Sequence, residues 1–144
     1  MTIRPYCDAE DRAAVMALWR HGFGDQRGHN DAGLVIDLKL AADDGLFFVG
    51  VEGVVVGTVM AGYDGHRGWI YRLTVALDLR DRGHGAALVR HAEGVLAGRG
   101  CPKVNLQVVA TNAGVVGFYE SLGYAVEPRI SMGKCLPAQG WGGS

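Results

Sequence analysis

The sequence predicts one α/β (α+β) domain, in which a mixed, mostly antiparallel central sheet of about seven strands carries helices on both faces. Three observations support this fold class. Apolar residues make up 49% of the 144 residues, which is enough for a packed core in a chain of single-domain length. Stretches with a helical apolar period alternate with stretches of strand character. The 23 glycines follow no collagen-like repeat and mark the turns between these stretches.

The first part of the chain is predicted to form a short strand over 2–4 and two helices. Asp8 is expected to cap the first helix, because an aspartate side chain accepts hydrogen bonds from the free amides of a first turn. Apolar residues then recur at the spacing of one helical face: Val15, Leu18, Trp19 and Gly22. The polar stretch 22–33 is expected to be a loop, and 34–42 a second helix that ends before Gly45.

Three stretches of strand character come next. They are Leu46–Glu52, Val54–Tyr63 and Trp69–Val75. Gly53 separates the first two, and the polar segment 64–68 separates the second from the third. Such short connections are typical of strands that pair with their sequence neighbours in a mostly antiparallel sheet.

A helix is predicted from Gly83 to about 98, with Pro102 as a stop signal behind it. The following segment, Lys103–Val109, alternates between apolar and other residues with a period of two. Its apolar positions are Val104, Leu106 and Val108. This pattern predicts a strand with one apolar face.

The last part of the chain is predicted to hold a helix over 115–122 and two short strands, Tyr124–Glu127 and Ile130–Lys134, which complete the set of seven. The glycine-rich tail 136–144 is expected to be flexible. Residues 1–135 therefore form a single predicted domain.

Charge and cysteine content exclude several classes of protein. A net charge of −1 argues against general nucleic-acid binding, and no apolar run approaches the ~18 residues that a membrane span needs. The three cysteines have no disulfide or metal-ligand spacing, so we expect reduced thiols and a cytoplasmic protein. A monomer or a homodimer is expected. Acidic residues outnumber basic ones up to Asp64 and the reverse holds beyond it, so an anion site is expected in the second half.

The segment Arg80-Asp81-Arg82-Gly83-His84-Gly85-Ala86 lies between a predicted strand and a predicted helix. Glycines at this position let a ligand approach the backbone, and the free amides and dipole of a helix start favour negative charge. Arg80, Arg82 and His84 add positive side chains. The segment therefore indicates an anion-binding loop, although an ordinary glycine-rich helix start is the alternative.

Two better-known phosphate motifs do not match this segment. A dinucleotide fingerprint requires a third glycine where this chain has Leu88, and no glycine-rich loop ends in the Lys-Ser/Thr pair of a Walker A motif.

Two motifs together resemble the GNAT superfamily of acetyl-CoA-dependent N-acetyltransferases. Leu73-Thr74-Val75 followed by Arg80-x-x-Gly83-x-Gly85 is similar to the acetyl-CoA motif of that family. Asn112 and the segment Phe118-Tyr119-Glu-Ser-Leu-Gly123-Tyr124 are similar to its second signature, Asn-x(6)-Tyr-x-x-x-Gly-Phe/Tyr. The resemblance covers nearly the whole chain and is greatest to the small bacterial branch that includes the ribosomal-protein alanine N-acetyltransferases.

The resemblance implies where acetyl-CoA binds. The cofactor lies in a slot between a splayed pair of parallel strands, and the main chain of Leu73, Thr74 and Val75 pairs with its pantetheine arm. The amides from Asp81 to Ala86 hold its pyrophosphate. Asn112 contacts the cofactor near its pantetheine end, and Tyr119 is the general acid that protonates the departing thiolate. A phenol with an ordinary pKa of ~10 keeps its proton at neutral pH, as this role requires. A core aromatic on the helix stripe is the alternative for Tyr119.

Gln107 departs from the pattern of the ribosomal-protein branch, whose members have a glutamate at this strand position. An amide accepts no proton in the useful pKa range, so Gln107 is expected to orient water or the acceptor rather than act as the base. Without that glutamate, the sequence favours an α-amine or a small amine of low pKa, which is partly neutral near pH 7.5. The expected function is direct acetyl transfer from acetyl-CoA to a primary amine, on a protein N-terminus or a small molecule. The alternative is a CoA-binding regulatory or interaction module that has lost turnover.

Several histidines are candidates for catalytic or metal-ligating groups. His66 has a suitable intrinsic pKa for a base but is expected to lie in a solvated turn, as are His21 and His29 in their loop. His84 and His91 are seven residues apart, and no His/Cys cluster has ligand spacing, so no metal is expected.

Overall fold

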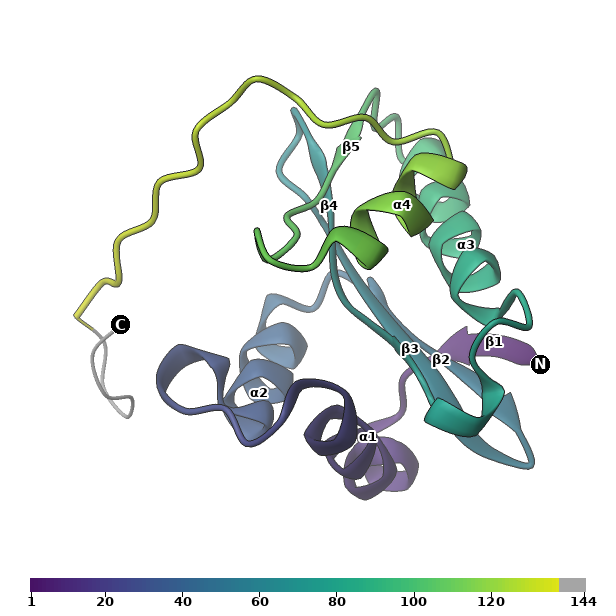
Figure 1. Ribbon diagram of the computed structural model, residues 1–144. Coiled ribbons are helices and arrows are strands. Elements are labelled where there is room, and N and C mark those ends of the chain that lie inside the picture. The colour runs from purple at the N-terminus through teal and green to yellow at the C-terminus, as the bar shows by residue number, and fades with distance from the viewer. Residues whose placement is uncertain (138–144) are drawn as a thin grey trace.

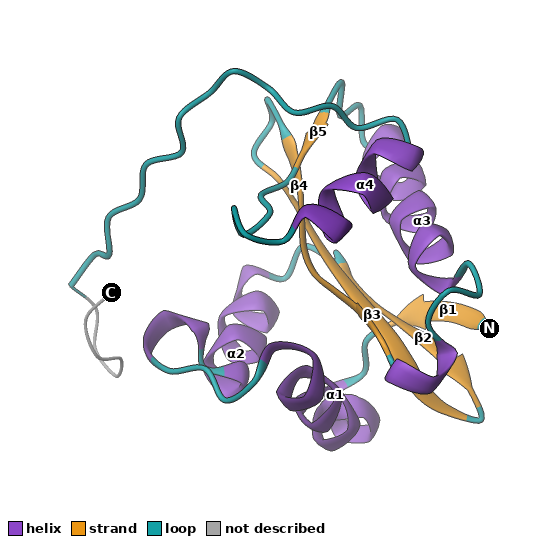
Figure 2. Ribbon diagram, viewed as in Figure 1, coloured by secondary structure: helices purple, strands orange, loops and turns teal. Residues whose placement is uncertain are grey.

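A five-stranded sheet lies between two helical layers in the part of the chain that the structure, a computed structural model, describes, residues 1–137 (Figure 1). Helices α1 and α2 cover one face of the sheet, and α3 and α4 cover the other (Figure 2). The elements are β1 (Thr2–Pro5), α1 (Asp8–Phe23), α2 (Ala32–Ala42), β2 (Phe47–Glu52), β3 (Val54–Tyr63), β4 (Gly68–Val75), α3 (His84–Gly98), β5 (Val104–Asn105) and α4 (Ala113–Ser121). Short 3-10 turns lie at Gly28–Asn30 and Leu77–Leu79. Within residues 1–137 no helix combines the length and the apolar character needed to cross a membrane.

The strand order follows the chain, β1-β2-β3-β4-β5. The first four strands pair antiparallel, and β5 pairs parallel to β4 because helix α3 crosses over between them. The α/β class, the helices on both faces and the mixed sheet are therefore confirmed.

Each face of the sheet has its own core. On the side of α1 and α2, which we call the α1 face, the core consists of Val15, Trp19, Ile36, Phe47, Val49 and Met60. On the opposite side, the α3 face, the buried residues include Phe48, Val59, Ile70, Val75, Leu88 and Leu96. Successive strand residues alternate between the two sets, as the pleat of a sheet requires.

Helix α1 begins one residue earlier than expected. Cys7 is the N-cap residue, and Asp8 lies inside the first turn, where it accepts hydrogen bonds from Tyr6 Oη and Arg12 Nε. The amide of Cys7 donates to Asp11 Oδ2 at 2.8 Å. Asp11 thus stabilises the helix start, and its carboxylate is held by Arg4 at 2.7 and 2.9 Å. Helix α2 likewise starts before position 34, because the Asp31 side chain caps it by accepting from the amide of Leu34.

The sheet has two strands fewer than predicted among the described residues. Tyr124–Glu127 and Ile130–Lys134 form no strand ladder, and the predicted strand Lys103–Val109 pairs only at Val104 and Asn105. The alternation within 103–109 was correct as a burial pattern, since Val104 and Leu106 pack against the α3-face core. The segment 124–134 instead approaches 103–107 through the polar side chains of Glu127 and Ser131, without backbone pairing, and its apolar residues Val126, Ile130 and Met132 stay exposed. Part of the predicted tail, 138–144, lies outside the described residues.

Candidate functional site

Strands β4 and β5 separate soon after they meet. They pair only at Gly68 with Val104 and at Trp69 with Asn105. Gly68 permits this junction, because a Cβ there would lie 2.8 Å from Cys101 Sγ. Beyond Trp69, no strand within residues 1–137 pairs with this edge of β4, which includes Leu73, Thr74 and Val75. The result is an open strand edge to which an extended ligand can add.

The loop from Asp81 to Ala86 exposes a run of backbone donors. Its six consecutive N–H groups make no hydrogen bond to any other group of residues 1–137. Gly83 lies in the left-handed region at φ 84°, and Asp81 shares that region at φ 63°. The first amide with an intrahelical partner is that of Ala87, which donates to Gly83 O at 3.0 Å. Free amides at a helix start favour an anion, so the role predicted for this loop stays a prediction with a suitable backbone geometry.

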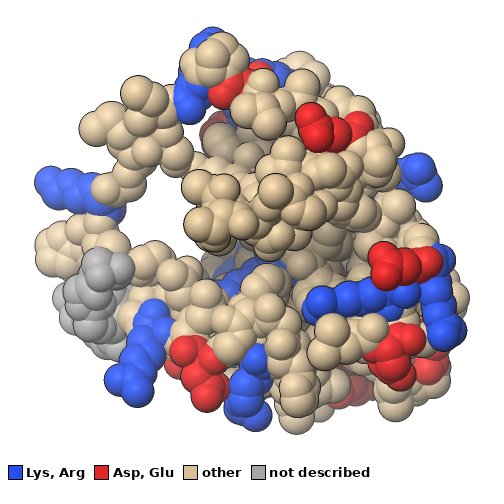
Figure 3. Space-filling view, viewed as in Figure 1, with Lys and Arg blue, Asp and Glu red and all other residues tan. Residues whose placement is uncertain are grey.

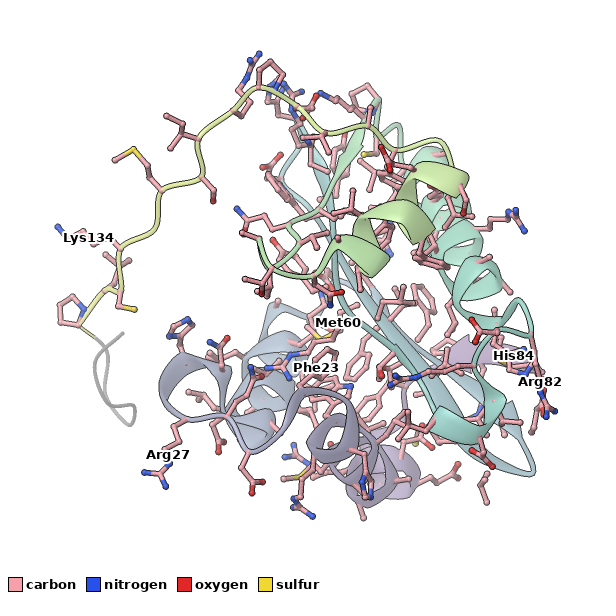
Figure 4. All side chains as sticks on the ribbon, in the orientation of Figure 1. Phe23, Arg27, Met60, Arg82, His84 and Lys134 are labelled. Atoms are coloured by element: carbon pink, nitrogen blue, oxygen red, sulfur yellow. The ribbon has the colours of Figure 1, made fainter. Side chains whose placement is uncertain are left out.

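The basic side chains around this loop are arranged differently from the expectation. Arg80 Nε donates to Val75 O at 3.0 Å and so ties the loop to the end of β4. His84 Nε2 lies 2.9 Å from Glu52 Oε1, which also forms an ion pair with the N-terminal ammonium at 3.3 Å. Figure 4 shows the side chains of Arg82 and His84 at the outer edge of the molecule. Arg80 and His84 are thus engaged by other groups of the protein, whereas the amides of the loop are free.

Tyr119 lies on α4 and is partly buried against the α3-face core, together with Leu73 and Phe118. Its ring packs edge-on against those of Phe118 and Tyr124, with centroids 5.0 and 5.6 Å apart. Burial raises the pKa of Tyr119 to about 12, so the phenol keeps its proton over the whole physiological range. Phe118 also faces Gly85, where an added Cβ would lie 3.3 Å from Cζ. Helix α4 is thereby held against the start of α3.

Gln107 and Tyr119 line the same cleft, which has a volume of about 1100 Å³ and extends along the segment after β5. Gln107 is exposed, and its Nε2 donates to Ser131 Oγ. Asn112 caps α4, with Oδ1 accepting from the amide of Val115 at 3.3 Å. The structure thus brings Tyr119 and Gln107 together, while Asn112 already has a local structural role.

The other candidate histidines do not line the cleft of Gln107 and Tyr119, although His21 lines a smaller pocket together with Val75 and Arg80. His66 is exposed in the β3–β4 turn, where its amide donates to Asp64 Oδ1, and His21 and His29 are exposed near the ends of the α1–α2 connection. Among residues 1–137, no group of three or more His, Cys, Asp or Glu side chains is placed to hold a metal ion.

Arg72 was not among the predicted site residues. It lies at a bulge in β4, directly before Leu73, and its guanidinium stacks on Trp19 and Phe23. One signal could have pointed to it, because Arg72 is the single charged residue in the otherwise apolar or neutral stretch Trp69–Val75.

Comparison with known proteins gives a consistent result. A model of the acetyltransferase (GNAT) family matches residues 11–124. An acetyltransferase of Yersinia enterocolitica is 44% identical over 137 residues, which cover 94% of this chain and 96% of that protein. Among solved structures, Ard1 from Thermoplasma volcanium superposes with a TM-score of 0.76 at 23% identity, over 88% of this chain and 83% of its own. The aminoglycoside N-acetyltransferase AAC(6')-Iy in complex with CoA superposes with a TM-score of 0.75 at 18% identity, over 93% of each chain. These two structures share the fold.

Proposed function

Since the chain belongs to the GNAT family of acetyltransferases, we propose that it transfers the acetyl group of acetyl-CoA directly to a primary amine. The observation that carries this proposal is the open edge of β4 beside six free amides at the start of α3. The acceptor is a small-molecule amine or a protein N-terminus, and the donor and the amine are bound together. As in the sequence prediction, residues 1–135 act as one catalytic domain.

The residues of this chain suit acetyl-CoA as the donor. The amides from Asp81 to Ala86 are placed for its pyrophosphate, and the backbone at Gly83 leaves open space in front of them, since nothing lies within 4 Å of a Cβ added there. Main-chain groups of Leu73 to Val75 are placed for the amide-containing arm. The donor supplies a thioester, whose acyl carbon is open to attack by a neutral amine.

Tyr119 is proposed as the general acid. When the amine nitrogen bonds to the acyl carbon and the carbon–sulfur bond breaks, the leaving sulfur requires a proton. A phenol whose pKa is raised to about 12 by burial is fully protonated, so it can donate a hydrogen bond to the sulfur as negative charge develops there. The amine loses its own proton to water, because Gln107 is not a base.

Release of free CoA from acetyl-CoA, measured against a panel of amines, tests the proposal. We expect saturable turnover with at least one amine and a loss of about 100-fold in kcat for Tyr119→Phe, with little change in the affinity for acetyl-CoA. Tyr63→Phe is the matched control, since Tyr63 is also a partly buried phenol against the α3-face core, and its Oη donates to Gly100 O.

Two results would contradict this assignment. Acetyl-CoA binding without release of CoA for any amine would favour the CoA-binding regulatory module instead. A Tyr119→Phe protein that keeps its rate and only melts earlier would make Tyr119 a core residue.

A further inference from the structure

Arg72 is a partly buried cation with few partners of its own. Its guanidinium lies 4.7 Å from the centroid of the Trp19 ring and 5.1 Å from that of Phe23. Nη2 donates to Asn30 O at 2.9 Å, and no Asp or Glu of residues 1–137 pairs with it. Burial lowers the pKa of Arg72, although an arginine remains charged in proteins. A guanidinium has five N–H donors, and within residues 1–137 that of Arg72 makes a hydrogen bond only to Asn30 O.

A β-bulge holds Arg72 in place. The β3–β4 register shifts between Thr58 and Met60, and Arg72 adopts the left-handed region at φ 52°. Thr58 Oγ1 donates to Arg72 O at 2.7 Å and accepts from Trp19 Nε1 at 2.9 Å, and Thr58 is fully buried. The extra residue turns the Arg72 side chain to the α1 face, next to Tyr71, which pairs with Met60 on that face.

The α1 face is the side from which an acceptor reaches the acyl group. Leu73 and Val75 pack into the core of the α3 face, and the free amides at the start of α3 lie on that side as well. A donor that follows the open edge of β4 therefore leaves the α1 face free for the amine. Figure 3 shows the surface hollowed between α4 and the layer of α1 and α2, with basic side chains on the floor of the hollow. Tyr71 and Phe23, 49% and 36% exposed, supply apolar surface on this face.

We propose that Arg72 binds a carboxylate of the acceptor, so that the favoured substrates are amines that also carry a carboxylate, which is the chemical class of the free amino acids. The inference rests on the proposed function and narrows it. A guanidinium and a carboxylate form two parallel charge-assisted hydrogen bonds, which fix orientation as well as position. In a protein, the N-terminal residue has a neutral peptide carbonyl in place of this carboxylate, so Arg72 favours a free amino acid over a protein N-terminus.

The test compares acids with their carboxamides. For several amino acids and the matching amides, kcat/KM for CoA release is measured and expressed per neutral amine, because the two amines differ in pKa. We expect the acid to exceed the amide by about 10- to 100-fold, mainly through KM, as for the loss of a hydrogen bond to a charged group. Arg72→Met, which keeps a stem to cover Trp19, is expected to abolish this ratio, and Arg72→Lys to retain part of it. Arg27→Met, at an arginine that Figure 4 shows pointing away from the body of the molecule, is the matched control and should leave the ratio unchanged.

Equal values for acid and amide in the wild-type protein would overturn the inference, as would a ratio that persists in folded Arg72→Met. A purely structural Arg72 would lower the melting temperature and reduce kcat/KM equally for both members of each pair. If Arg72→Met does not fold, the inference is tested by the ratio of kcat/KM for acid and amide in the wild-type protein and in Arg72→Lys. If no amine is acetylated, the proposed function fails. The inference is then decided by whether amino acids, and not their amides, raise the melting temperature of the CoA-bound protein.

Discussion

The pyrophosphate site proposed at the start of α3 leads to a quantitative prediction at Gly83. This residue adopts φ 84°, and a Cβ built on it meets nothing within 4 Å. A side chain at Gly83 is therefore strained by its backbone conformation but creates no clash. We expect Gly83→Glu to fold and to lose the stabilisation that acetyl-CoA confers on the wild-type protein. Gly83→Ala is the control, because it carries the same backbone strain without the charge.

The magnitudes follow from the conformation. The left-handed region costs a non-glycine residue about 1–2 kcal/mol, which is about 3–8 °C in Tm for a domain of this size. In Gly83→Glu, the negative charge at the positive end of the α3 dipole recovers about 0.3–1 kcal/mol. Both variants should therefore remain folded, with the glutamate variant at least as stable as the alanine one.

Thermal unfolding with and without acetyl-CoA separates the two effects. At a concentration of 100 times Kd, a ligand stabilises the folded state by about 2.7 kcal/mol, which raises Tm by about 10 °C. The wild-type protein should show this rise, Gly83→Ala most of it and Gly83→Glu none. A folded Gly83→Glu protein with the wild-type shift would refute the assignment of the amides from Asp81 to Ala86 as the pyrophosphate site.

Three further predictions concern ionisable groups and their partners. Gln107→Glu should keep or raise activity toward amines of high pKa, because the new carboxylate can act as a base and Ser131 Oγ can donate to it where it now accepts from Gln107. Gln107→Leu should lower this activity. The check is a pH–rate profile of both variants on one amine, and the absence of a new ionisation and of a rate change in Gln107→Glu would place Gln107 outside the acceptor site. Because burial raises the pKa of Tyr119 to about 12, kcat should not fall between pH 8 and about 10.5, and a descending limb in that range would contradict the raised pKa. Asp11→Asn should cost about 2–4 kcal/mol at pH 7, since Asp11 is 2% exposed and pairs with Arg4 and the Cys7 amide. The hydrogen bond from Arg4 lowers the pKa of Asp11 in the folded state, so this stability is present above about pH 4 and is lost as the pH falls through the folded pKa. The measurement is the free energy of unfolding of wild type and variant against pH. A difference between the two that stays constant down to about pH 2 would show that the charge of Asp11 does not stabilise the fold.

Local features of the sequence were sufficient for the helices and for the first four strands. The helix stripe through Val15 and Trp19 and the glycine turn at Gly53 act over a few residues, so each is readable from neighbours in the chain. The same holds for the loop at Gly83, where a glycine and the start of a helical period predict free amides. Tyr119 was identified through a family motif, and its partial burial against Phe118 and Tyr124 is what raises its pKa.

The sequence pattern did not predict which distant segments pair through the backbone. The apolar alternation in 103–109 predicts which side chains are buried. Val104 and Leu106 pack against the α3 face as that pattern requires, although only Val104 and Asn105 pair with β4 through the backbone. The two C-terminal strands were wrong among the described residues for the same reason, since 124–134 meets the segment 103–107 through side chains.

The sequence by itself determined the fold class, the order of the elements up to β4 and the run of free amides before α3, because these depend on residue period and on conformations that glycine permits. The tertiary structure decided where β4 and β5 separate, which residues line the cleft beside Tyr119, and that a bulge turns Arg72 onto the α1 face. Each of these depends on the register between segments far apart in the chain. A shift of one residue reverses the direction of a side chain without changing the apolar pattern, so only the packed sheet determines which groups meet an acceptor.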